Sequence, residues 1–193
     1  MLNYSFFNLL RQSISGHKGW EKTWQSPRLK KTYDVVIIGA GGHGLATAYY
    51  LAAKHGIRNV AVIEKGWLGG GNSGRNTQVV RSNYFWPQSA DFYEHSLKLY
   101  ERLNAELNFN VMLSQRGILN LAHSHHELES QRRWVNSIQI NGIDSEFMNP
   151  QEIKKLVPLI NLQGRFPVHG GFIQKRGGIA RHDAVVWAYA RAA

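Results

Sequence analysis

Residues 33–65 constrain the fold more than any other part of the chain, because they have the layout of a βαβ dinucleotide-binding unit. In order, they contain an apolar run at 35–38, the motif Gly39-x-Gly41-x-x-Gly44, a helix-like segment, a second apolar run at 60–63, and Glu64. In this fingerprint the first glycine permits a tight turn, the second lets the backbone approach a pyrophosphate, and the third lets the helix pack close to the strand. The order of elements predicts an α/β fold of the Rossmann-like class.

The same segment predicts where a nucleotide binds. Phosphates are favoured at a helix N-terminus, where unpaired N–H groups and the helix dipole attract negative charge. Glu64 lies twenty residues beyond Gly44, at the end of the second expected strand. A carboxylate there accepts hydrogen bonds from ribose hydroxyls. A glycine-rich turn in some other α/β protein would explain neither the second strand nor this acid.

A glycine-dense loop follows at 66–81 and interleaves polar side chains with its glycines. These side chains are Asn72, Arg75, Asn76 and Thr77, which offer donors to phosphates and to the edge of a flavin. A flexible connector is the alternative, but functional side chains concentrate on loops. We therefore expect this loop to contact the ligand.

The residues after this loop predict elements that interrupt the nucleotide fold. The spacing indicates helices at 89–107 and 127–140, a short strand at 117–122, and a helix that begins at a capping box of Asn149 and Glu152. A cluster of His123, His125 and His126 also lies here. We interpret it as a solvated turn and expect no metal, because no acid stands nearby at ligand spacing.

The net charge of +10 is unevenly distributed. Residues 1–33 hold six Lys or Arg and one acid, so half of the surplus belongs to a basic N-terminal arm, residues 1–32. The arm has no apolar run long enough for a signal peptide or a membrane span. It is either a mitochondrial transit peptide or an arm that docks on its own protein or on a partner subunit. Aromatic and basic residues do not interleave as in RNA- or DNA-binding modules, so we expect no nucleic-acid partner.

The absence of cysteine excludes disulfides, thiolate metal sites and cysteine nucleophiles, and it fits a cytoplasmic protein. At 193 residues the chain is long enough for one domain. Its last residues read as a helix without a termination signal, which predicts the N-terminal part of a longer protein, truncated at the C-terminus.

Residues 174–183 place a glycine pair and polar residues before this last helical run, so His182 or Asp183 should lie at the helix N-terminus. There the helix dipole disfavours a protonated imidazole and keeps a ring nitrogen available as a nucleophile. A capping or packing histidine is the alternative, and the local sequence alone favours that alternative.

Four stretches resemble the β subunits of heterotetrameric sarcosine oxidases, within the D-amino-acid-oxidase-like flavoprotein superfamily. They are YDVVIIGAGGHGLATAYYLA, NVAVIEKGWLGGGNSGRNTQVVRSNYFW, SQRGILNLAHS and GGIARHDAVVWAYAR, and the resemblance includes the arm with SGHKGW. It implies a Rossmann-like FAD-binding domain of the GR2/DAO type with interleaved substrate-domain elements, of which this chain is the first part. We divide the domain at 33–193 into nucleotide-binding residues 33–82, substrate or interface elements 83–173, and a flavin-attachment loop and helix 174–193.

The resemblance implies two flavins. FAD is bound non-covalently by the βαβ unit, and FMN is attached covalently to a histidine that matches His182, which outweighs the capping alternative. With the fingerprint glycines, the motif matches give as FAD contacts Gly39, Gly41, Gly42, His43, Gly44, Glu64, Lys65, Asn72, Arg75, Asn76 and Thr77. Arg81 matches an arginine near the flavin ring of related monomeric oxidases, where a cation holds the substrate carboxylate or stabilises reduced flavin. A surface salt bridge is the alternative for Arg81.

The reaction implied is the oxidation of sarcosine to glycine, with hydrogen peroxide and either formaldehyde or methylene-tetrahydrofolate as further products. The implied partners are α, γ and δ subunits, with no membrane. One alternative is another FAD-dependent amine or amino-acid dehydrogenase of the same fold. The other is an inactive flavin-binding fragment.

Overall fold

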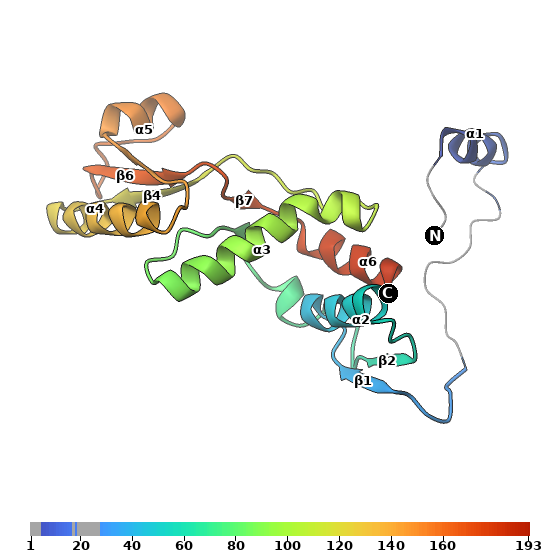
Figure 1. Cartoon of the computed structure of the whole chain (residues 1–193). Helices are drawn as coiled ribbons and strands as arrows, with labels where there is room; N and C mark the ends of the chain where they lie inside the picture. Colours follow the sequence, from blue (N-terminus) through green and yellow to red (C-terminus); the bar gives the residue numbers. More distant parts are fainter. Residues whose placement is uncertain (1–4, 17, 19–27) are drawn as a thin grey trace. The chain divides into compact units, whose positions relative to one another are not determined.

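The computed structural model describes residues 5–16, 18 and 28–193, which group into two compact units (Figure 1). The first unit combines the residues up to Asn76 with 105–109 and 182–193, and the second combines 77–104 with 110–181. Part of the basic arm, at 1–4, 17 and 19–27, lies outside the described residues. In the described ranges, no helix is both long and apolar enough to cross a membrane.

The first unit contains the expected βαβ arrangement. Strands β1 (Val35–Ile38) and β2 (Val60–Ile63) pair in parallel, and helix α2 (Gly42–His55) connects them. The helix ends at Gly56, whose φ of 69° is the left-handed conformation that glycine adopts at no steric cost. The Rossmann-like prediction for this segment is confirmed.

Helix α6 (His182–Ala192) belongs to the same unit, although it lies far away in the sequence. It packs along α2, where the ring centroids of Tyr49 and Tyr189 are 5.8 Å apart and those of Tyr50 and Tyr189 are 6.1 Å apart. Burial of such rings is a large part of the stability of a small unit. The packing of α2 against α6 therefore fixes the end of the chain on the βαβ unit.

One apolar surface of the first unit faces solvent. Among the described residues β1 pairs only with β2, and the side chains of Val36, Ile38 and Ile63 are 52%, 89% and 56% exposed. Strands of a parallel sheet are normally covered on both faces, which is why their residues are apolar. These three side chains thus mark surface that further chain covers in a complete doubly wound sheet.

The second unit is built on an antiparallel sheet with the strand order β4-β6-β5. The strands are β4 (Ile118–Ala122), β5 (Glu146–Met148) and β6 (Gly170–Gln174), and the helices are α3 (Pro87–Glu106), α4 (His125–Ile140) and α5 (Pro150–Leu156). Its core surrounds Phe172, which is fully buried and clusters with four other buried residues, Ala90, Val135, Ile138 and Ile143. Gly171 is required beside it, because a Cβ there would lie 2.3 Å from the carbonyl oxygen of Asn120.

The helices expected at 89–107 and 127–140 are present; both ends of α3 are shifted, whereas α4 ends at the predicted residue and only its start is shifted. Helix α4 begins two residues earlier than predicted because Ser124 caps it, accepting a hydrogen bond from the N–H of Glu127. The predicted capping box is also present, with Asn149 and Glu152 each bonding the backbone of the other. Strands β5, β6 and the two-residue β7 (Gly178–Ile179) were not predicted; β7 pairs with β3 (Val79–Val80).

A polar network in the second unit holds the turn between β6 and β7. The guanidinium of Arg176 lies 2.7 Å from Glu94 and 2.9 Å from Glu101, and Ser82 donates a hydrogen bond of 2.7 Å to Glu94. Burial acts to raise the pKa of Glu94, but the hydrogen bonds from Ser82 and Arg176 hold it below its usual value. Hydrogen bonding to Arg176 likewise lowers the pKa of Glu101. The side chain of Gln174, fully buried, joins the network: its Oε1 accepts from the backbone N–H of Ser82, and its Nε2 donates to the Ser82 hydroxyl.

Candidate functional site

The turn between β1 and α2 has the geometry that the glycine motif predicts. Gly39 has a φ of 104°, and its N–H donates to the carbonyl of Ile63 at 2.7 Å. A Cβ on Gly44 would lie 2.0 Å from the carbonyl oxygen of Gly39. The first turn of α2 therefore approaches the end of β1 more closely than any residue with a side chain allows.

The N-terminus of α2 is a cradle of backbone N–H groups that begins with Gly41 and Gly42, which have no side chains of their own. Gly41 is the N-cap residue and offers no side-chain capping bond. The N–H of Gly42 instead donates to the hydroxyl of Ser73 at 2.9 Å, and a Cβ on Gly41 would lie 3.1 Å from the same oxygen. Unpaired N–H groups and the helix dipole make such a terminus an anion site.

Ser73 is a site residue that sequence reasoning missed. It lies in the short 3-10 helix η1 (Asn72–Gly74), inside the glycine-dense loop. The loop composition indicated contacts with a ligand, but nothing local indicated that this hydroxyl would reach the helix thirty-one residues earlier.

Glu64 closes the other side of the cradle. One carboxylate oxygen accepts from the N–H of Ala40 at 2.9 Å, and the other accepts from the N–H of Gly66 at 3.0 Å. These two bonds hold the pKa of Glu64 below its usual value, and the bond from Ala40 has the larger effect. The carboxylate is thus ionised at neutral pH and keeps lone pairs free for the hydroxyls of a ribose.

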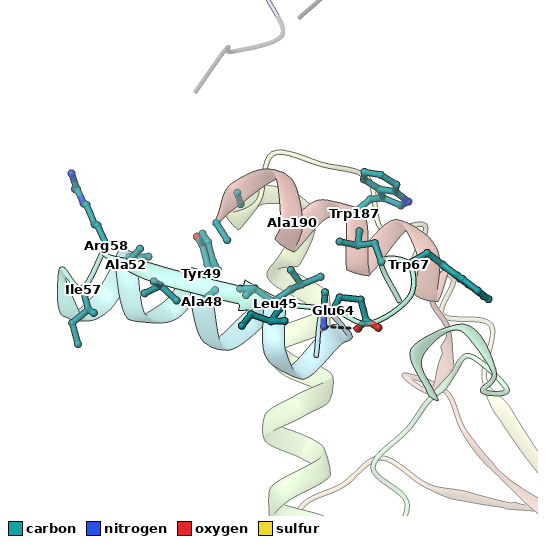
Figure 2. Close-up of a pocket in the computed structure, with 18 of the residues that line it drawn as sticks. Leu45, Ala48, Tyr49, Ala52, Ile57, Arg58, Glu64, Trp67, Trp187 and Ala190 are labelled. Atoms are coloured by element: carbon teal, nitrogen blue, oxygen red, sulfur yellow. Dashed lines mark hydrogen bonds between the residues drawn. The ribbon is translucent and has the colours of Figure 1, made fainter. Parts of the chain in front are cut away.

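An apolar pocket of about 1200 Å³ adjoins Glu64 within the first unit. Figure 2 shows Trp67 and Trp187 at the end near Glu64, and Ile57 and Arg58 at the opposite end. Its walls come from α2, β2 and α6, and they include Ala40 but not the N–H groups of Gly41 and Gly42. The carboxylate therefore lies between an apolar volume on one side and the phosphate cradle on the other.

Most other predicted contacts lie in the first unit with the cradle. The side-chain amide of Asn76 donates to the carbonyls of Asn72 and Ser73, so this amide holds the shape of the loop. The side chains of His43, Lys65 and Arg75 are exposed. Thr77 belongs to the second unit. The roles of these residues with a cofactor stay predictions.

His182 is the first residue of α6, one of the two residues, with Asp183, that the sequence predicts at the helix N-terminus. Its Nδ1 is buried and has no hydrogen-bond partner among the described residues. Helix α6 packs against η1, and the side chain of Val186 would lie 3.2 Å from a Cβ on Gly69. His182 therefore sits at a helix N-terminus with one ring nitrogen enclosed by protein.

Arg81 belongs to the second unit and is held by its own segment. Its Nη1 donates to the side-chain oxygen of Asn83 at 2.6 Å, and its guanidinium lies 4.4 Å from the ring centroid of Tyr84. Tyr84 in turn stacks on Tyr93 with the centroids 4.0 Å apart. Neighbouring side chains thus orient the guanidinium. Among the described residues Arg81 forms no salt bridge, which was the alternative for it.

These features fit the nucleotide half of FAD: N–H groups for the pyrophosphate, an ionised carboxylate for a ribose, and no Cβ where the backbone must approach the ligand. Among solved structures, the chain resembles L-proline dehydrogenase from P. horikoshii with a TM-score of 0.76 and 25% identity, covering 85% of this chain and 42% of that one. Sarcosine oxidase subunit beta of Rhodobacter capsulatus is 55% identical over 193 residues, which are 100% of this chain and 47% of the relative. Mitochondrial dimethylglycine dehydrogenase of Rattus norvegicus is 30% identical over 155 residues, which are 79% of this chain and 18% of the relative.

The chain therefore spans less than half the length of these curated relatives. The family model for FAD dependent oxidoreductases, DAO, matches residues 34–193, which is all but one of the residues after the basic arm. With the close approach of Gly44 to Gly39 and the placement of Glu64, this match shows that the chain belongs to the DAO family of FAD-dependent oxidoreductases.

Proposed function

We propose that this chain is the FAD-binding part of a sarcosine-oxidising subunit. The observation that carries the proposal is the 55% identity to the Rhodobacter capsulatus sarcosine oxidase subunit beta over every residue of the chain. The cradle of Gly41, Gly42 and Glu64 supports the FAD-binding part of this proposal, since it supplies donors for a pyrophosphate and an acceptor for a ribose.

In this function the residues of the chain bind and orient. The N–H groups at the start of α2 hold the pyrophosphate, and the hydroxyl of Ser73 gives up its bond to Gly42 when a phosphate oxygen takes that donor. Glu64 holds a ribose. FAD, when bound, supplies the redox chemistry that removes a hydride from the N-methyl carbon of sarcosine.

Arg81 is the candidate for a catalytic electrostatic role. Asn83 and Tyr84 orient its guanidinium, which costs less reorganisation than orienting a free side chain during the reaction. A cation fixed in this way holds the carboxylate of the substrate or stabilises the negative charge of reduced flavin.

We also propose His182 as the residue of covalent FMN attachment. His182 is the first residue of α6, and its Nδ1 is buried without a hydrogen-bond partner among the described residues, so the attachment would use the other ring nitrogen. The proposal includes assembly with α, γ and δ subunits in the cytoplasm; the two flavins, when bound, would supply the transfer of electrons to dioxygen.

A hybrid enzyme tests the function. The 193 residues replace the matching part of the Rhodobacter capsulatus subunit beta, and the hybrid is produced with the other subunits of that enzyme. We expect oxygen uptake and hydrogen peroxide formation with sarcosine. Reduction of an artificial acceptor without oxygen uptake would instead favour an amine dehydrogenase, and a hybrid that binds FAD but oxidises no amine would favour the inactive flavin-binding fragment.

The same hybrid tests the covalent attachment. After acid precipitation, part of the flavin should remain with the protein. In His182→Ala that retained fraction should disappear while the non-covalent FAD remains, whereas loss of both flavins would point to a structural role for the histidine.

A further inference from the structure

The feature that the proposed function leaves unexplained is helix α1 (Phe6–Ile14) in the basic arm. It is a well-formed amphipathic helix: Ser5 caps it by accepting from the N–H of Asn8, and its apolar residues Phe6, Leu10 and Ile14 follow each other at intervals of four. Phe7 and Leu9 flank this row, Ser13 lies between Leu9 and Phe6, and the other polar side chains, Asn8, Arg11 and Gln12, lie on the opposite face. We call the row with its two flanking residues the apolar face of α1.

Among the residues that the structure describes, none covers the apolar face. None of the residues of α1 is buried, and the side chains of Phe6, Phe7 and Ile14 are 72%, 78% and 80% exposed. A helix of nine residues is too short to be stable by itself in water, because isolated helices below about 12–15 residues are marginal. A nine-residue helix with aromatic and aliphatic side chains on one face is therefore expected to be stabilised by packing against another surface.

The arm that contains α1 is shared with a relative that is a subunit of a complex. The FAD-dependent oxidoreductase family match begins at residue 34, so the arm lies outside the catalytic fold that family members share. The Rhodobacter capsulatus relative, which is named as a subunit, matches over all 193 residues and so includes the arm. The arm thus accompanies the oxidoreductase fold in a polypeptide that assembles with others.

The charge of the arm restricts the partner further. Six Lys or Arg and one acid lie in residues 1–33, and Arg11 extends from the polar face of α1 itself. A surface that receives this arm must offer an apolar groove for the helix and carboxylates at its rim, since like charges at an interface are destabilising.

We propose that α1 docks by its apolar face into an acidic-rimmed apolar groove on another subunit of the oxidase complex. The inference rests on the proposed function for the identity of the partner, and on α1 for the surface. Phe7 and Leu10 are the expected anchors, and the basic residues of the arm contribute at the rim, where charge mainly affects the rate of association.

The test uses the 193-residue chain loaded with FAD. The probe is the set of purified remaining subunits of the Rhodobacter capsulatus enzyme, and fluorescence anisotropy measures binding between the two. Leu10→Asp should weaken binding by about tenfold or more, as expected for an anchor residue. Gln12→Asp, the matched control with the same added charge on the polar face, should change affinity by less than about twofold. Higher salt should slow association of the parent chain.

Three outcomes overturn the inference: no binding to these subunits, equal loss for Leu10→Asp and Gln12→Asp, or tighter binding of α1 to vesicles of phosphatidylcholine and phosphatidylglycerol than to the subunits. FAD affinity of both variants is measured in parallel by flavin fluorescence quenching. If the chain binds no FAD but still binds the subunits through Leu10, the proposed function fails and the docking inference stands. If FAD binds normally and Leu10→Asp has no effect, the reverse holds.

Discussion

Replacing Gly44 with alanine tests the closest contact in the nucleotide-binding unit. The added Cβ would lie 2.0 Å from the carbonyl oxygen of Gly39 and 3.3 Å from Cγ2 of Ile37. Contacts below 3.0 Å are essentially never seen for real Cβ atoms, so the helix must move by at least about 1 Å away from the strand. The obstructing atom belongs to the backbone and cannot rotate away.

Overpacking of this kind typically costs about 1–3 kcal/mol, and the backbone obstruction places Gly44→Ala at the upper end. For a chain of this size the cost corresponds to a melting temperature lower by about 6–12 °C. The same movement displaces the N–H groups of Gly41 and Gly42 from the phosphate positions, so affinity for FAD should fall by about tenfold or more. Thermal unfolding by circular dichroism and quenching of flavin fluorescence measure the two effects.

Gly42→Ala is the matched control for stability. Gly42 lies two residues before Gly44, at the start of the same helix, and a Cβ there would lie 3.6 Å from the hydroxyl of Ser73, an ordinary contact. Its melting temperature should stay within about 2 °C of the parent. If Gly44→Ala melts with the control and binds FAD as the parent does, then the helix and strand do not approach as described, and the glycine argument for this site is wrong.

Three further changes address the remaining contacts. Glu64→Gln should lower FAD affinity by about tenfold, since a charged acceptor is lost. The pKa of Glu64 is depressed in the folded chain, so the carboxylate stabilises the fold above the unfolded pKa of about 4.3, and this stabilisation is lost as the pH falls through the folded pKa. The stability of the variant, measured by urea titrations from pH 7 to pH 3, should therefore depend less on acid than that of the parent. Arg176→Gln should destabilise the chain by about 1–2 kcal/mol at pH 7, less than for a fully buried ion pair because solvent reaches the guanidinium. The pKa of Glu94 is also lowered, so this loss of stability should shrink below about pH 4, where Glu94 becomes protonated. Ser73→Ala should lower the stability of the FAD-free chain, measured by calorimetry, by about 1 kcal/mol because the N–H of Gly42 loses its acceptor. With saturating FAD the loss of stability should be smaller. An equal loss with and without FAD would show that no phosphate accepts from this N–H.

Local signals were sufficient for the parts of the fold that are close in sequence. The turn of Gly39 and the acid at Glu64 both belong to a unit whose strands are joined by one helix, so the pattern of apolar runs and glycines determines it. The capping box of Asn149 and Glu152 is equally local, since its bonds join residues three apart. Strand β6 was missed because GGFIQ is short, glycine-rich and buried at every position, so it lacks the alternation that marks a strand.

What the sequence by itself determined is therefore the βαβ unit, its cradle and the position of His182 at the start of a helix. Only the tertiary structure decided that Ser73 reaches the N–H of Gly42, that the final helix packs along α2, and that Arg176 joins Glu94 and Glu101. The physical reason is the range of the interactions. Turns, caps and strand patterns are set by neighbours in the chain, whereas a hydrogen bond or ring contact between distant segments depends on how whole elements pack, and no residue carries a local signal for it.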